Sequence, residues 1–132
     1  MTAADRPVDK PRPVYLDLFA IRQPLPAIVS ILHRISGALL FLVGIPLLLW
    51  YVQRSLASPE GFQAVMAPFA TPFGKLVLLV LAWAYVFHLL AGLRHLGLDL
   101  HIGIRLQPAH SSAAVVLVLS ILVALVVAVR LW

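Results

Sequence analysis

Three long apolar runs limit what this chain of 132 residues can fold into. They cover residues 35–52, 76–93 and 113–129, and the only acidic, basic or imidazole side chain inside them is His88. A helix of 18 residues, the length of the first run, spans about 27 Å, close to the roughly 30 Å hydrocarbon core of a bilayer. A backbone in lipid has to satisfy its own hydrogen bonds, and three strands cannot close a barrel. The runs therefore predict an all-α membrane protein with three transmembrane helices.

The composition excludes a soluble globular domain. Hydrophobic residues make up 62% of the chain and charged residues 11%, less than half of the roughly 25% that is usual in soluble domains. The ten Lys and Arg residues flank the apolar runs, so the net charge of +5 indicates membrane topology and no nucleic-acid partner. The sequence has no cysteine, so the chain itself offers no thiolate for an iron–sulfur cluster or a zinc site.

The distribution of Lys and Arg predicts how the chain is oriented. Seven of these residues fall at one end of the predicted spans and three at the other: Arg6, Lys10, Arg12, Arg22, Arg34, Arg94 and Arg105 against Arg54, Lys75 and Arg130. Basic residues favour the cytoplasmic side of a membrane. We therefore expect the N-terminus and the second loop to be cytoplasmic and the C-terminus to lie outside.

Polar segments divide the chain into an arm and an anchor. Residues 1–27 carry five prolines and mixed charges, and we expect them to form a cytoplasmic N-terminal arm. Residues 28–132 are expected to form the transmembrane anchor domain. Its predicted spans cover about residues 30–53, 74–99 and 110–131.

Two connections between the spans also carry signals. Ser58, Pro59 and Glu60 follow in the order of an N-cap, a first-turn proline and a first-turn acid. They predict a short helix that lies outside the membrane. Residues 103–112, "GIRLQPAHSS", are expected to form a polar link between the second and third spans.

Two histidines of the second span share one helix face. His88 and His95 are seven residues, or two turns, apart, which places the imidazoles about 10 Å apart along the axis. Gly92 lies between them and should leave a flat slot, and Asp99 continues the face one turn further. An ionisable group at membrane depth is costly, so we expect His88 to be a haem ligand or a proton relay. The alternative is that His88 is a structural residue, a hydrogen-bonded histidine packed between helices.

A haem held by His88 would need a second axial ligand from a partner subunit. The other candidates, His33 and His110, fall at the edges of the first and third predicted spans. On sequence alone, neither reaches the depth of His88.

A second polar group lies at the entrance of the first span, in "SILHRISG". Ser30, His33 and Arg34 are neighbours on one helical surface, at the same predicted end as His95. Haem propionates turned toward the cytoplasm would meet a basic rim of His33, Arg34 and His95, since arginine pairs well with carboxylates. Alternatively, Arg34 only reaches out to the lipid headgroups.

A quinone is the other candidate occupant of this end. The Ser30 hydroxyl and the Arg34 guanidinium can donate hydrogen bonds to its carbonyl groups. Asp99 would then serve a proton path, or it would simply pair with Arg34 or Arg94.

The segment "RPVYLDLFAIRQPLPAIVSILHRISG", followed by "SPEGF" and "HLLAGLRHLGLDL", resembles the cytochrome b membrane-anchor subunit of bacterial succinate dehydrogenase. The similarity covers roughly residues 12–132. It implies a multi-pass protein of the bacterial cytoplasmic membrane that forms half of a heterodimeric anchor bundle. It also implies that the chain helps to bind haem b and ubiquinone.

The resemblance assigns roles to individual residues. His88 corresponds to the axial ligand of the haem iron, and His33, Arg34 and His95 correspond to residues around the propionates. Ubiquinone binding would fall to Ser30, Ile31, Arg34 and, less directly, Asp99. A second anchor subunit would supply the other axial histidine, an iron–sulfur subunit would deliver electrons, and a flavoprotein subunit would oxidise succinate.

Two other functions are considered. One is a haem-free, quinone-binding anchor of a fumarate reductase-like complex, against which His88 beside Gly92 argues. The other is a component of a small proton-coupled transporter with His88 as a relay. Such a site would usually place more ionisable residues deep in the other spans, and the first and third offer none.

Overall fold

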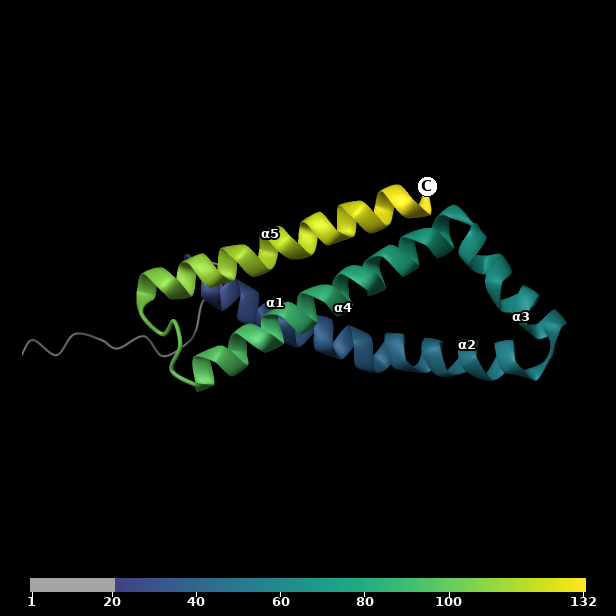
Figure 1. Ribbon diagram of the computed structural model, residues 1–132, viewed down its shortest axis with the longest axis horizontal. Helices are drawn as coiled ribbons and strands as arrows, with labels where there is room; N and C mark the ends of the chain where they lie inside the picture. Colours follow the sequence, from purple (N-terminus) through teal and green to yellow (C-terminus); the bar gives the residue numbers. More distant parts are fainter. Residues whose placement is uncertain (1–20) are drawn as a thin grey trace, which may run out of the picture.

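The computed structural model describes residues 21–132, so most of the predicted arm at 1–27 lies outside the described residues. Within that range every element of regular secondary structure is a helix, and there are no strands. Figure 1 shows the elements in order. They are α1 (Leu25–Leu39), a π-helical turn η2 (Leu40–Gly44), α2 (Ile45–Ala57), α3 (Pro59–Met66), a 3₁₀ turn η3 (Ala67–Ala70), α4 (Pro72–Asp99) and α5 (Leu106–Leu131).

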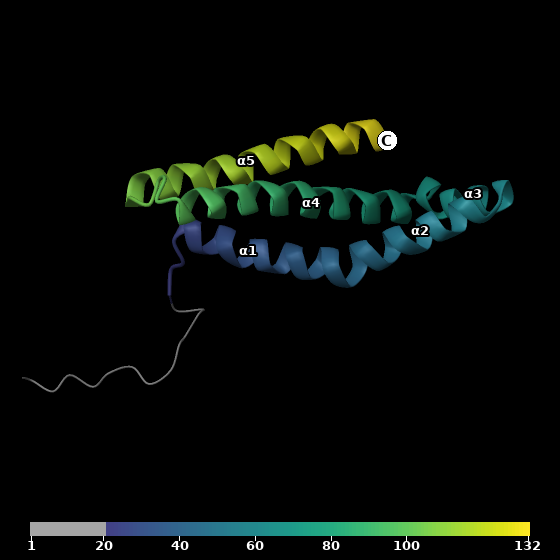
Figure 2. The same ribbon diagram turned by 60° about the horizontal axis from the view of Figure 1, so that its bottom comes forward.

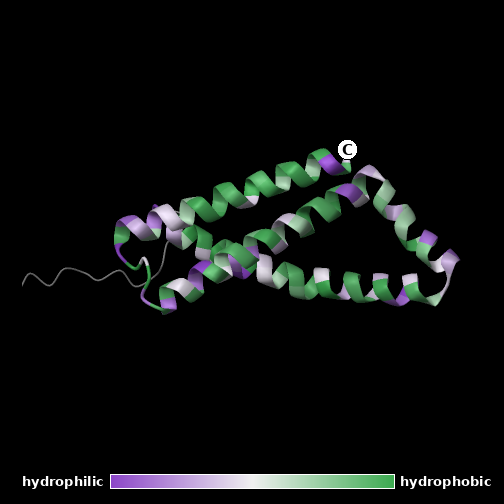
Figure 3. Cartoon of the chain, viewed as in Figure 1, coloured by the Kyte–Doolittle hydropathy of each residue, from purple (hydrophilic) through white to green (hydrophobic). Residues whose placement is uncertain are grey.

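The three predicted membrane helices are present. Leu25–Ala57, Pro72–Asp99 and Leu106–Leu131 are each apolar and long enough to cross a bilayer. Each begins before the span predicted for it, and the first also extends beyond it. Figure 3 shows hydrophobic residues along the helices and hydrophilic residues gathered at their connections.

Helix α4 is the centre of the bundle. It packs against α5 on one side and α1 on the other, and α1 also contacts α5. α2 instead diverges from α4, and α3 with η3 closes the gap between their far ends (Figure 1). An apolar cleft of about 350 Å³ lies in this wedge, with Tyr51, Phe69 and Leu81 among its lining residues. The bundle is therefore closed at the end of the α4–α5 loop and open at the other.

The first span bends at a single π-helical turn, which is visible below α4 in Figure 2. The backbone N–H of Ile45 donates to the carbonyl of Leu40, five residues earlier. Pro46 follows at once, and because proline has no N–H it cannot continue the ordinary ladder to residue 42. The turn separates α1, which packs on α4 and α5, from α2.

The core lies where α1, α4 and α5 meet. Apart from Phe87, its members are small or medium-sized: Val29, Ala91, Ala113 and Val116. Lipid tails are as apolar as these side chains, so close packing between small residues stabilises helix pairs in a membrane more than burial from water does. Among the described residues two polar side chains are buried, and each of them, Ser36 and Ser120, donates to a carbonyl three residues earlier in its own helix.

The short helix after the first span starts as predicted. Ser58 is its N-cap, and the Ser58 hydroxyl oxygen accepts a hydrogen bond from the backbone N–H of Gly61 at 3.0 Å. The Glu60 backbone N–H, and then the Ser58 hydroxyl, lower the pKa of the Glu60 carboxyl. Both effects favour the ionised acid at the positive end of the helix.

The link predicted at residues 103–112 is wrong in extent. α5 already begins at Leu106, and the N–H of Ala109 donates to the carbonyl of Arg105. Pro108 is compatible with this start, because the first N–H groups of a helix lack partners within the helix anyway. The α4–α5 loop is shorter than expected and turns at His101, whose φ of 62° is left-handed.

Candidate functional site

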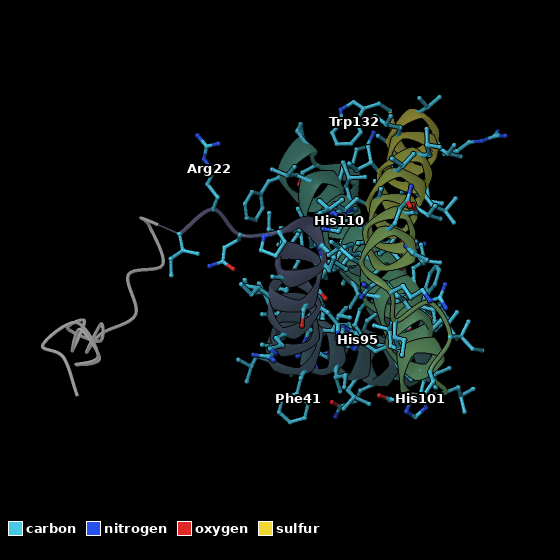
Figure 4. The ribbon with its side chains drawn as sticks, turned by 90° about the vertical axis from the view of Figure 1, so that its left-hand side faces the viewer. Arg22, Phe41, His95, His101, His110 and Trp132 are labelled. Carbon is cyan, nitrogen blue, oxygen red and sulfur yellow. The ribbon has the colours of Figure 1, made fainter. Side chains whose placement is uncertain are left out.

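Three histidines from two helices form an imidazole column at the closed end of the bundle. The rings of His33 on α1 and His88 on α4 are stacked, with centroids 4.2 Å apart and an interplanar angle of 18°. The ring of His95 lies 5.1 Å from that of His33, tilted by 35°. Figure 4, viewed from this end, places His95 among the helices and His101 at the periphery. His33 therefore lies between the two histidines that sequence spacing put on one face.

The slot expected beside Gly92 is filled. A Cβ added at Gly92 would lie 3.6 Å from the Nε2 atom of His33, so the His33 ring occupies that space. The prediction that no other histidine of this chain reaches the depth of His88 is also wrong. Spacing along one helix did not reveal it, because the depth of His33 depends on how α1 crosses α4.

His33 nevertheless is no second axial partner for a metal bound by His88. Two axial ligands approach one iron from opposite sides of the haem plane, with the iron between them. The rings of His33 and His88 are instead face to face at 4.2 Å, which leaves no room for a porphyrin in between. His33 therefore does not fit the position of a second axial ligand for a haem bound by His88.

The hydrogen bonds of His88 leave one ring nitrogen available. Its Nδ1 atom lies 3.0 Å from the backbone carbonyl oxygen of His33 and 3.2 Å from the hydroxyl oxygen of Ser36. Among the described residues, Nε2 has no hydrogen-bond partner. Metal-binding histidines usually donate one N–H to a carbonyl or carboxylate and coordinate through the other nitrogen. The environment of His88 fits an axial ligand of haem.

Two contact residues of His88 were missed by sequence reasoning. They are Ser36, which is 3% exposed, and Gly37, whose added Cβ would lie 2.7 Å from Cε1 of His88. Both belong to "SILHRISG" and follow His33 by three and four positions, on the same helical surface. That spacing indicates that Ser36 and Gly37 share the helical surface of His33. Only the packing of α1 on α4 shows that this surface contacts His88.

The predicted quinone residues lie on the same end of the bundle as the imidazole column. Ser30 is half-buried on α1, while Ile31 and Arg34 are exposed on that helix. Asp99 is exposed at the last residue of α4. Ser30 and Arg34 are one helical turn apart and share a surface.

Arg94 does not take the role considered for it as a partner of Asp99. In residues 21–132 its hydrogen bonds go to α5: Nε donates to the Ser112 hydroxyl at 3.0 Å, and a terminal nitrogen donates to the Ala109 carbonyl at 3.2 Å. The guanidinium therefore joins α4 to α5 beside the imidazole column.

The arrangement does not suit a chelated metal ion. Within the described part of the chain, no three histidine, aspartate or glutamate side chains converge as a metal-binding group. A single available imidazole nitrogen at membrane depth is what one face of a haem requires. Fold and site thus define a multi-pass helical membrane protein with a candidate haem ligand.

Comparison with known proteins identifies the family. The family described as the succinate dehydrogenase/fumarate reductase transmembrane subunit matches residues 8–127. A relative from Coxiella burnetii is 38% identical over 122 residues, 92% of this chain and 97% of its own length. One from Paracoccus denitrificans is 36% identical over 113 residues, 86% of each chain. Both are named succinate dehydrogenase cytochrome b556 subunit. The chain belongs to this family of transmembrane subunits.

Family membership decides between the functions considered from the sequence. A transmembrane subunit of succinate dehydrogenase is part of an enzyme complex, and this chain is accordingly a membrane anchor of such a complex. The resemblance found in the sequence is confirmed, and the anchor is supported over the transporter component. Its three apolar helices are those of a multi-pass protein of the bacterial inner membrane.

Proposed function

We propose that this chain is the anchor of succinate dehydrogenase that holds one side of a haem b and contributes to a ubiquinone site. The observation that carries the proposal is the hydrogen bonding of His88: Nδ1 faces two acceptors on α1, and Nε2 faces none among residues 21–132. The names of the relatives support a b-type cytochrome. The haem would supply a one-electron redox centre at the closed end of the bundle.

The residues around His88 would divide the binding of haem among them. His88 would be the axial ligand through Nε2, and a second membrane-anchor subunit would supply the other axial histidine. His33, stacked on His88, and His95, tilted against His33, would donate ring N–H groups to the propionates, and the exposed guanidinium of Arg34 would add a charge-assisted hydrogen bond. The rings of His33 and His95 follow that of His88 toward the α4–α5 loop, so the propionates would be held on that side.

Ubiquinone would bind on the neighbouring surface of α1. The Ser30 hydroxyl and the Arg34 guanidinium, one turn apart, are donors suited to a quinone carbonyl. Ile31, 44% exposed between them in sequence, offers an apolar contact for the ring. Donors held in place stabilise the negative charge that the quinone oxygens acquire during reduction. Asp99, exposed at the end of α4, is the weakest member of this set and would assist proton uptake.

The same end of the bundle would face the cytoplasm and the soluble partners. The start of α1 and the α4–α5 loop lie at one end (Figure 1), and four of the seven basic residues in the described range fall there, namely Arg22, Arg34, Arg94 and Arg105. The iron–sulfur subunit would dock on this end and pass electrons to the quinone. Succinate would be oxidised on the flavoprotein subunit.

An optical spectrum tests the proposal. The complex is extracted in detergent, recovered through this chain, and measured as a dithionite-reduced minus oxidised difference. We expect the sharp α band of a low-spin b-type haem in a complex that also contains the iron–sulfur and flavoprotein subunits. An intact complex without this band would overturn the haem assignment and leave the haem-free quinone anchor.

Loss of the Arg34 side chain is expected to impair quinone reduction. A hydrogen bond to a charged group contributes about 1.5–3 kcal/mol, so Arg34→Leu should lower kcat/KM for ubiquinone by roughly 10–100-fold. Ser30→Ala, which removes a neutral donor, should lower it by less. Rates with ubiquinone are divided by rates with a soluble dye that takes electrons from the flavoprotein and iron–sulfur subunits.

A matched control is Arg105→Leu. Arg105 is exposed in the α4–α5 loop at the same end of the bundle, outside the proposed site. The Arg105→Leu substitution removes one positive charge from that end without removing a proposed hydrogen-bond donor to the quinone. Equal losses in Arg34→Leu and Arg105→Leu would mean that only surface charge matters and would contradict a specific quinone contact.

A further inference from the structure

One turn of α1 surrounds the ring of His88. Both hydrogen bonds of this ring come from residues 33–36, and a Cβ added at Gly37 would meet the ring. We propose that Ser36 and Gly37 are positioning residues that fix the tautomer and the orientation of the His88 imidazole, so that Nε2 presents its lone pair to haem iron. This inference rests on the function proposed above and deepens it, because it concerns residues that bind neither haem nor quinone themselves.

The hydrogen-bond partners decide the tautomer. A backbone carbonyl only accepts, so the 3.0 Å contact between the His33 carbonyl and Nδ1 of His88 requires a proton on Nδ1. The Ser36 hydroxyl donates its own proton to the same carbonyl at 2.9 Å. Its oxygen, 3.2 Å from Nδ1, therefore also acts as an acceptor toward His88. With the proton on Nδ1, neutral His88 has its free lone pair on Nε2.

Gly37 fixes where the ring lies. A Cβ at this position would be 2.7 Å from Cε1, 3.3 Å from Nδ1 and 3.6 Å from Nε2 of His88. Real side chains do not approach this closely, so only glycine lets the ring edge rest against the backbone of α1. The His33 ring covers one face at 4.2 Å. The His88 ring is therefore held at its edge by Gly37, on one face by His33 and at Nδ1 by hydrogen bonds. Together these contacts determine the direction in which Nε2 points.

The surroundings make these contacts rigid. Ser36 is 3% exposed, and the α4 residues Ala84, Phe87 and Ala91, on the turns around His88, are fully buried. A donor N–H that is hydrogen-bonded to fixed acceptors makes the imidazole a stronger electron donor to a metal. Such a ligand favours ferric over ferrous iron. The Ser36 oxygen is thus expected to lower the reduction potential of the haem.

A pair of serine variants tests the electronic part of the proposal. Ser36→Ala is compared with Ser120→Ala, because both serines are buried in a helix and both donate to a carbonyl three residues earlier. Redox titration of the detergent-extracted complex gives the midpoint potential of the haem. We expect a positive shift and about 10-fold weaker haem retention in Ser36→Ala alone, the usual size for loss of a contact to a metal-binding histidine.

A pair of glycine variants tests the steric part. Gly37→Ala is compared with Gly97→Ala on α4, where an added Cβ meets nothing within 4 Å. The ratio of haem to flavin in the assembled complex is the measurement. We expect Gly37→Ala to lose haem or to lose the low-spin α band, and Gly97→Ala to match the wild type.

The outcomes separate this inference from the proposed function. A wild-type complex without b-type haem overturns both. A wild-type complex with haem, whose potential and haem content are unchanged in Ser36→Ala and Gly37→Ala, overturns only the positioning role. If Gly37→Ala does not assemble, Ser36→Ala decides, since it removes a single oxygen atom. Failure of Ser36→Ala to assemble, with Ser120→Ala intact, would make Ser36 a packing residue and would also overturn the inference.

Discussion

His88→Leu is expected to abolish the b-type haem spectrum of the complex. Leucine keeps the apolar bulk at this position but has no nitrogen to bind iron. The substitution also removes the hydrogen bonds of Nδ1 to the His33 carbonyl and the Ser36 hydroxyl, which join α4 to α1 and contribute about 0.5–1.5 kcal/mol each. We therefore expect no α band in the reduced-minus-oxidised spectrum and a lower yield of assembled complex.

The control for this experiment is His110→Leu. His110 is half-buried near the start of α5, outside the imidazole column. The His110→Leu substitution removes an imidazole from the same end of the bundle and should leave the haem spectrum unchanged. A low-spin haem that persists in His88→Leu would show that another residue binds the iron and would remove His88 from the site.

Gly74→Ala is expected to cause the largest loss of folding stability among single-methyl additions. Gly74 is buried where α4 starts, and its added Cβ would lie 2.8 Å from Cα of Phe69 and closer still to the Pro68 carbonyl oxygen. These are backbone atoms of the turn before α4, so no side chain can move aside. We expect a loss of about 3 kcal/mol or more, measured as a lower thermal midpoint and yield of the complex in detergent.

The helix cap adds to this effect. The backbone N–H of Gly74 donates to the Thr71 hydroxyl oxygen at 3.1 Å, and that hydroxyl itself donates to the Pro68 carbonyl. A turn that opens to admit a methyl group loses this N-cap as well. Gly97→Ala, a change of the same size in open space on the same helix, should leave the midpoint unchanged or raise it. Similar losses in both variants would contradict the steric argument.

The membrane architecture could be predicted because it follows from length and composition alone. A bilayer demands about 20 apolar residues per helix, and three runs meet that requirement. The cap at Ser58 was equally readable, because Ser, Pro and Glu each act within one turn of chain. Both features depend only on the nearby sequence, which is why they could be predicted.

The candidate site was only partly predictable, because it joins two helices. The spacing of seven residues places His88 and His95 on one face of α4, but it does not show which residues of other helices contact that face. His33 fills the space beside Gly92 because α1 crosses α4 at that level. Gly37 supports His88 for the same reason. Such contacts depend on the crossing of helices and on their rotation, which a single sequence does not reveal.

Charge pairing was a poor guide for a similar reason. Arg94 and Asp99 are close in sequence and opposite in charge, so an ion pair was considered. Arg94 instead reaches the Ser112 hydroxyl and the Ala109 carbonyl, because α5 packs directly against that side of α4. An exposed ion pair contributes little, whereas a guanidinium held between two helices satisfies polar groups at their contact.

The π-helical turn at Leu40–Gly44 allows the two halves of the first span to have different rotations about the helix axis. A turn closed from Ile45 back to Leu40 contains one residue more than an α-turn, which rotates the following helix by about 100° relative to an unbroken one. The rotation of α1 about its axis, which turns Ser36 and Gly37 toward His88, is thus independent of the rotation of α2. A one-residue insertion or deletion in this turn would therefore change the rotation of α2 and leave the register of the imidazole column unchanged.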